Sequence, residues 1–109
     1  MRRASKVDLN QSEIVGALRG VGASVEPLHA VGRGVPDLLV GFRSDIWLIE
    51  VKSKAAKKRN EGKTDAQVEW HASWRGKPVA IVRTVDEAMS LIGVTSYTQL
   101  HRKIVGDVE

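Results

Sequence analysis

The sequence predicts an α/β domain built on a mixed β-sheet flanked by helices. Two near-continuous apolar runs, DLLVGF (37–42) and IWLIEVK (46–52), are joined by the turn RSD. Such runs are typical of hairpin strands that are covered on both faces. Segments with helical spacing and capping residues stand before and after this hairpin, which favours helices on both faces of the sheet. The predicted order is α-β-β-β-α-β-α-α.

Two elements are expected before the hairpin. Residues 1–7 are expected to form a flexible basic tail. Asp8 has a side chain suited to capping a helix, which should run from about Leu9 to Arg19. The segment ASVEPLHA (23–30) predicts a short strand at the edge of the sheet, because Pro27 has no amide to donate to a neighbouring strand.

A helix is expected from Thr64 to about Arg75, with Gln67 completing a capping box. Gln67, Trp70, His71 and Trp74 follow one another at helical spacing, so they should share one face. If that face meets the sheet, the tryptophans belong to the core and Gln67 lies at the end that carries the hairpin's charged residues. For His71 we expect a packed, hydrogen-bonded side chain rather than a metal ligand.

The remaining elements follow this helix. PVAIVR (78–83) predicts a strand parallel to 46–52, since a helical crossover separates the two. Thr84 should cap a helix that ends at about Ile92, with Glu87 completing a second capping box. A last helix is expected over 96–105.

Composition limits the possible classes of protein. A length of 109 residues suggests one domain over 1–109, and 42% hydrophobic with 28% charged residues is ordinary for a globular protein. The absence of cysteine excludes disulfides and suits a reducing cytosol. No apolar run approaches the roughly 18 residues of a membrane span. We therefore expect a cytoplasmic protein with no membrane contact, and a net charge of +4 favours a polyanionic partner.

Charged residues occupy one end of the hairpin. Counted about its turn, Leu38 faces Ile49, and Asp37 then faces Glu50. Facing side chains have Cβ atoms about 4.5–5.5 Å apart. Strand alternation puts Lys52 on the same face as Glu50. The hairpin register therefore predicts a cluster of two carboxylates and one amine.

Two carboxylates that face each other on apolar strands repel and are costly to desolvate. A divalent cation removes that cost, and oxygen ligands alone suit a hard cation such as Mg²⁺. Lys52 could then orient an attacking water or stabilise charge at a phosphate. The alternative is an ion pair between one of the acids and Lys52 at the end of a strand.

The residues at this end of the hairpin resemble the motif of a known protein superfamily. The pair PD (36–37), followed after a short hairpin by EVK (50–52), resembles the PD-(D/E)xK nuclease superfamily over roughly residues 12–83. GVPDLLVG and TDAQVEW resemble its virus-type replication–repair nuclease (VRR-NUC) branch, and WLIEVKS is similar to the related archaeal Holliday-junction resolvases. The resemblance implies a restriction-endonuclease-like core and a role in DNA repair or recombination.

The resemblance also implies roles for single residues. It implies that Asp37, Glu50, the Val51 carbonyl and Glu13 hold Mg²⁺, for which Mn²⁺ would substitute, and that no organic cofactor takes part. It assigns catalysis to Asp37, Glu50, Lys52, Gln67 and Glu13. For Glu13 a solvated helix-face charge is an equal alternative. Gln67 has a structural alternative as well, as part of the capping box with Thr64, and the two roles are compatible.

Basic residues crowd the segment that follows the second hairpin strand. Phosphate contacts from such residues supply affinity without sequence specificity. The expected DNA-binding residues are Arg33, Lys54, Lys57, Lys58, Arg59 and Lys63, and a solvated loop is their alternative. The glycines of the loop GRG (32–34) precede a strand, whereas phosphate-binding loops precede a helix, so a small-molecule enzyme is disfavoured.

The sequence thus predicts a metal-dependent DNA endonuclease that recognises branched DNA, such as a Holliday junction, or duplex DNA. A homodimer would supply two active sites for paired strands. The alternative is a catalytically inactive nucleic-acid-binding module on a nuclease-like fold, with its acids merely ion-paired.

Overall fold

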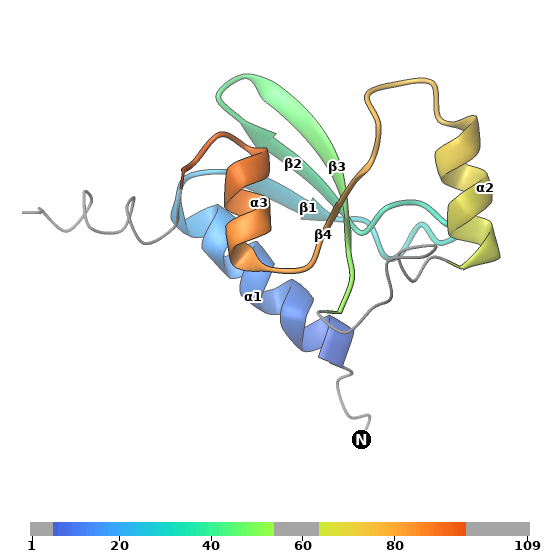
Figure 1. Ribbon diagram of the computed structural model, residues 1–109, viewed down its shortest axis with the longest axis horizontal. Helices are drawn as coiled ribbons and strands as arrows, with labels where there is room; N and C mark the ends of the chain where they lie inside the picture. Colours follow the sequence, from blue (N-terminus) through green and yellow to red (C-terminus); the bar gives the residue numbers. More distant parts are fainter. Residues whose placement is uncertain (1–5, 54–63, 96–109) are drawn as a thin grey trace, which may run out of the picture.

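The protein forms a mixed four-stranded sheet in the order β1-β2-β3-β4, flanked by helices (Figure 1). The computed structural model describes residues 6–53 and 64–95. Neighbouring strands are antiparallel except for β3 and β4, which are parallel as predicted. The elements are α1 (Lys6–Gly20), β1 (Ser24–Pro27), β2 (Leu38–Phe42), β3 (Asp45–Val51), α2 (Asp65–Ser73), β4 (Ala80–Val82) and α3 (Val85–Leu91).

The β2–β3 hairpin has the register that the sequence predicts. Leu38 pairs with Ile49, and the ladder runs on to Phe42 opposite Asp45. The turn is therefore only Arg43 and Ser44, because Asp45 of the predicted turn RSD is the first residue of β3. Both turn residues have positive φ, at 51° and 69°. Two-residue turns of that kind match the right-handed twist of hairpin strands. This register brings the start of β2 and the end of β3 together.

One face of the sheet is packed, whereas the other is exposed in the half of the hairpin near its turn. Helices α1 and α3 pack against each other and against the same face of the sheet, and both lie on one side of it in Figure 1. Their contact buries Ile14, Leu18, Leu38, Val40, Ile49, Val51 and Met89. On the opposite face, Leu39 is 38% and Ile46 is 62% exposed. The expectation that the hairpin strands are covered on both faces is therefore wrong for the described residues.

The N-terminal elements begin and end differently from the prediction. Helix α1 begins at Lys6, so Asp8 lies inside it rather than at its cap, and residues 6–7 are helical instead of forming part of a tail. Residues 1–5 lie outside the described part. Strand β1 is an edge strand as predicted, but it ends at Pro27 because the chain turns at once.

Helix α2 has the predicted capping box: Thr64 Oγ1 accepts from the amide of Gln67, whose side chain accepts from the amide of Thr64. The helix ends at Ser73, two residues before the predicted end, because Trp74 is extended and its Nε1 donates to the carbonyl of Lys77. None of its nine residues is buried. The tryptophans are therefore not core residues: Trp74 is 41% exposed and stacks on Trp70 with 4.9 Å between ring centroids.

Helix α3 is capped by Thr84 as predicted, and its hydroxyl oxygen accepts from the amide of Glu87 at 3.1 Å. The second hydrogen bond of the predicted capping box does not form. The Glu87 carboxylate accepts from the amide of Arg83, at 2.6 Å, rather than from that of Thr84. The helix predicted over 96–105 lies outside the described residues. No helix in the described ranges is long and apolar enough to cross a membrane.

Candidate active site

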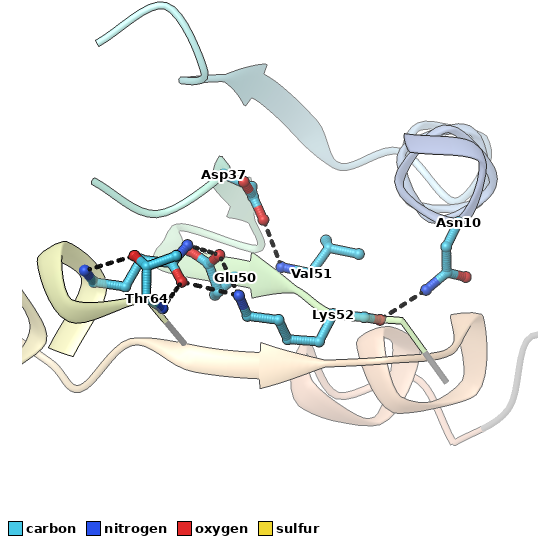
Figure 2. Close-up of polar contacts among 7 residues, drawn as sticks. Asn10, Asp37, Glu50, Val51, Lys52 and Thr64 are labelled. Carbon is cyan, nitrogen blue, oxygen red and sulfur yellow. Dashed lines mark hydrogen bonds and ion pairs between the residues drawn. The ribbon is translucent and has the colours of Figure 1, made fainter. Parts of the chain in front are cut away.

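Asp37 and Glu50 meet at one end of the hairpin. Asp37 directly precedes β2, and Glu50 is next to last in β3. The Asp37 Oδ2 atom accepts a hydrogen bond of 2.8 Å from the backbone amide of Val51 (Figure 2). This bond holds the Asp37 carboxylate against the strand that carries Glu50. The register of the hairpin, read from the sequence, thus leads to the observed proximity of the two acids.

Glu50 is a buried acid with two unlike oxygens. Its exposed fraction is 1%. Its Oε2 atom accepts from the Gln67 side-chain amide and lies 3.4 Å from the Lys52 Nζ atom. Its Oε1 atom is buried and accepts no hydrogen bond from the described residues. Burial, and then the charge of Asp37, raise the pKa of Glu50 to about 7, against a smaller opposing effect of Lys52.

Gln67 links helix α2 to both charged residues of β3. Its Oε1 atom accepts from the Lys52 ammonium group at 2.9 Å and from the Thr64 backbone amide at 2.9 Å. Its Nε2 atom donates to Glu50. The capping role and the active-site role predicted for Gln67 are therefore compatible. One amide side chain fixes the start of α2 and orients the acid and the amine.

The loop before β2 reaches the first turn of α2 at Gly34. This glycine has a φ of +82°, and a Cβ atom there would lie 2.2 Å from the carbonyl oxygen of Ala66. Only glycine permits this approach. Gly34 thus helps to place α2 and its Gln67 beside the hairpin. The sequence indicated a loop there, but it could not indicate which helix the loop contacts.

Asn10 is a further residue that the sequence reasoning missed. Its Nδ2 atom donates to the carbonyl of Lys52 at 3.0 Å (Figure 2). It also donates to the carbonyl of Arg83 at 2.8 Å. The Lys52 amide in turn donates to the carbonyl of Val82 at 3.0 Å. The backbone of Lys52 is therefore held from two sides. The sequence held one signal of this role: an asparagine inside a predicted helix, where its helix propensity is poor.

Two further predicted site residues, Glu13 and Arg33, lie on the surface of the described part of the chain. Glu13 is exposed on α1, and no group of three or more acids, histidines or cysteines able to hold a metal occurs within 6–53 and 64–95. The structure therefore does not bring Glu13 to Asp37 and Glu50. Arg33 is exposed in its loop with a φ of 58°. The basic residues Lys54, Lys57, Lys58, Arg59 and Lys63 lie outside the described residues.

The donor set fits a hard divalent cation. Mg²⁺ commonly keeps several waters and takes only one or two carboxylates from the protein, so Asp37 and Glu50 suffice. A cation nearby would offset both the burial of Glu50 and its repulsion from Asp37. The buried Oε1 of Glu50, which receives no hydrogen bond from the described residues, supports this fit.

Comparisons with known proteins agree with this geometry. A solved structure described as a VRR_NUC domain is similar to the chain with 31% sequence identity and a TM-score of 0.62. The match covers 82% of this chain and 96% of that one. No protein-family model and no curated protein matches the sequence.

Proposed function

We propose, because this chain belongs to the VRR-NUC family of nucleases, that it is a Mg²⁺-dependent DNA endonuclease. The observation that carries the proposal is the pairing of Asp37 with a buried Glu50 beside the Lys52 amine. Burying one carboxylate next to a second one is expensive for a fold that gains nothing from it. Such costs are typical of functional sites.

Each residue of the group has a role in phosphodiester hydrolysis. Asp37 and Glu50 would hold the cation, which when bound lowers the pKa of a water and polarises a phosphoryl oxygen. Lys52 orients the attacking water or stabilises negative charge on the phosphate. Gln67 keeps the Lys52 ammonium group in place. Hydrolysis with departure of the 3′ oxygen leaves 5′-phosphate ends.

A cleavage panel tests the proposal directly. Linear duplex, flap, nicked and four-way-junction DNAs are incubated with the protein in Mg²⁺, Mn²⁺ or chelator. We expect cleavage with either metal and none with chelator. If no DNA in the panel is cut under any condition, the nuclease proposal fails.

Substitutions of Asp37 and Glu50 test whether the observed cleavage depends on these two residues. Asp37→Asn and Glu50→Gln should each abolish it, since each removes a carboxylate while keeping the shape of the side chain. Asp45→Asn is the matched control, because Asp45 is an exposed acid at the other end of β3, ion-paired with Lys77. Loss of cleavage in all three variants would point to the fold rather than to the site.

The Lys52–Glu50 contact of 3.4 Å favours a second candidate function. An inactive nucleic-acid-binding module would keep these residues as an ion pair. It predicts DNA binding that weakens with salt but ignores Mg²⁺ and survives Asp37→Asn. Calorimetric titration with Mg²⁺ separates the two candidates, because only the nuclease should bind the ion and lose that binding in Asp37→Asn.

We also propose that the active form is a homodimer that selects branched DNA. Two sites related by a two-fold axis would suit paired strands, and isologous dimers are the commonest symmetric assemblies. Light scattering after size-exclusion chromatography should give twice the chain's 11.9 kDa. In the cleavage panel, a four-way junction should be cut on two opposed strands and faster than linear duplex. A monomer that prefers linear duplex would contradict this proposal.

A further inference from the structure

A groove lies beside Asp37, between α1 and the chain that leaves β1. It encloses about 600 Å³ and is lined by Gln11, Ser12, Gly16 and Arg19 on the helix side, with Pro27 and His29 across from them. Asp37 lines the same groove and is the acid among its lining residues. Glu50, Lys52 and Gln67 are not among the lining residues, so the groove adjoins the candidate site at Asp37.

Gly16 forms part of this groove and has no structural explanation in the described part of the chain. It lies inside α1, where glycine is a poor helix former, and its φ is not positive. Apart from the helix's own backbone, no described atom lies within 4 Å of the position that a Cβ would take. A glycine that the fold does not require leaves the backbone of α1 open to something that approaches it.

The groove presents donors suited to phosphate. Arg19 uses one N–H in a 2.9 Å bond to the carbonyl of Val25, out of the five N–H groups of a guanidinium. His29 and Ser12 are exposed, and Gln11 is half-buried. Arginine, serine and glutamine side chains are common donors to the phosphate oxygens of DNA. Asp37 is the exception, and in the proposed function its charge is offset by the cation.

We propose that this groove binds the sugar-phosphate backbone of the substrate strand where it leaves the scissile position on the α1 side. The proposal rests on the nuclease function and adds a phosphodiester-binding subsite to it. Gly16 lets the backbone lie against the helix, and Arg19 and His29 contact phosphates. Such contacts position the strand without reading its sequence.

Two substitutions at Gly16 test the subsite. Gly16→Ala should raise Tm by about 4–8 °C, because alanine favours a helix and the space is open. Gly16→Glu places a carboxylate among the phosphates and should weaken binding of a fluorescent duplex by at least about tenfold, measured by anisotropy with Ca²⁺ in place of Mg²⁺. Ser90→Glu adds the same charge on exposed α3 and should bind like wild type. Equal affinity of Gly16→Glu and wild type overturns the proposal.

A series of duplexes locates the effect. For wild type, KM should fall as nucleotides are added on each side of the cut. In Gly16→Glu the gain should disappear on one side only. A uniform loss on both sides overturns the subsite. If Gly16→Glu loses its helical circular dichroism, Ser12→Glu makes the same test from an exposed position in the groove.

The two proposals can fail separately. If wild type cuts no DNA, the nuclease function fails, and the anisotropy comparison still decides whether the groove binds a phosphodiester backbone. If wild type cuts and Gly16→Glu both binds and cuts equally well, only the groove proposal fails.

Discussion

The two sides of the candidate site are held in different ways. On one side, Asp37 and Glu50 belong to a hairpin whose α1-facing residues form the core, and Leu38 and Ile49 are both fully buried. On the other side, Gln67 stands on α2, which has no buried residue, and polar contacts reach from it to Glu50 and Lys52. Burial of apolar side chains therefore fixes the position of Asp37 and Glu50. Hydrogen bonds and the contact of Gly34 with α2 place Gln67. Substitutions on the hairpin side should therefore mainly lower stability, and substitutions on the α2 side should mainly lower activity.

The largest effect is expected on the hairpin side. Ile49→Ala removes a fully buried side chain and should lower the free energy of unfolding by about 2–5 kcal/mol. Urea denaturation followed by circular dichroism measures it. Ile46→Ala, at an exposed position on the same strand, is the control and should change stability little. If the two variants lose similar stability, the contrast between the packed and the open face is wrong.

The next effect is in the pH dependence of stability. The pKa of Glu50 is raised from 4.5 to about 7 in the folded state, so the folded protein binds more protons than the unfolded chain between these values. The stabilising contribution of protonated Glu50 is thus full below pH 4.5 and is lost as the pH rises through 7, by up to about 3 kcal/mol. Metal-free wild type should lose stability across this window relative to Glu50→Gln. Parallel profiles of the two proteins would contradict the raised pKa.

On the α2 side, Gln67→Ala should cost activity more than stability. It leaves Lys52 without its 2.9 Å acceptor and removes the donor to Glu50, which should lower cleavage about 10–100-fold, as loss of groups that orient metal ligands does. Losing its half of the capping box should cost only about 1 kcal/mol of unfolding free energy. Val68→Ala, at an exposed position of the same helix, should leave cleavage near wild type. A stability loss as large as that of Ile49→Ala would mean that α2 belongs to the core after all.

The smallest effect is expected at Asn10, which joins α1 to the ends of β3 and β4. Asn10→Leu leaves the carbonyls of Lys52 and Arg83 without this donor and should cost about 1–2 kcal/mol of stability. Cleavage should fall through kcat rather than KM, because the backbone of Lys52 is displaced and not the DNA contacts. Val25→Ala, a buried change in β1, provides a variant destabilised elsewhere. If both variants lose kcat equally, Asn10 has no positioning role.

The sequence allowed more of the hairpin side to be predicted than of the α2 side. The register of β2 and β3 follows from a two-residue turn and a period of two, both local properties of the chain, so Leu38 opposite Ile49 could be counted directly. The capping box of Thr64 and Gln67 is local as well, which is why it was predicted correctly. The exposure of Trp74 was not predicted, because helical spacing shows which residues share a face but not what that face contacts.

Residue types and short-range spacing were enough to predict a mixed α/β sheet, the hairpin register and the candidate group of Asp37, Glu50 and Lys52. The resemblance to a nuclease family added Gln67. Only the tertiary structure decided that Asn10 holds the carbonyl of Lys52, that Gly34 packs on α2, and that Glu13 is exposed on α1. The physical reason is distance along the chain. Asn10 and Lys52 are 42 residues apart, and such contacts depend on how helices pack on the sheet rather than on local conformational preference.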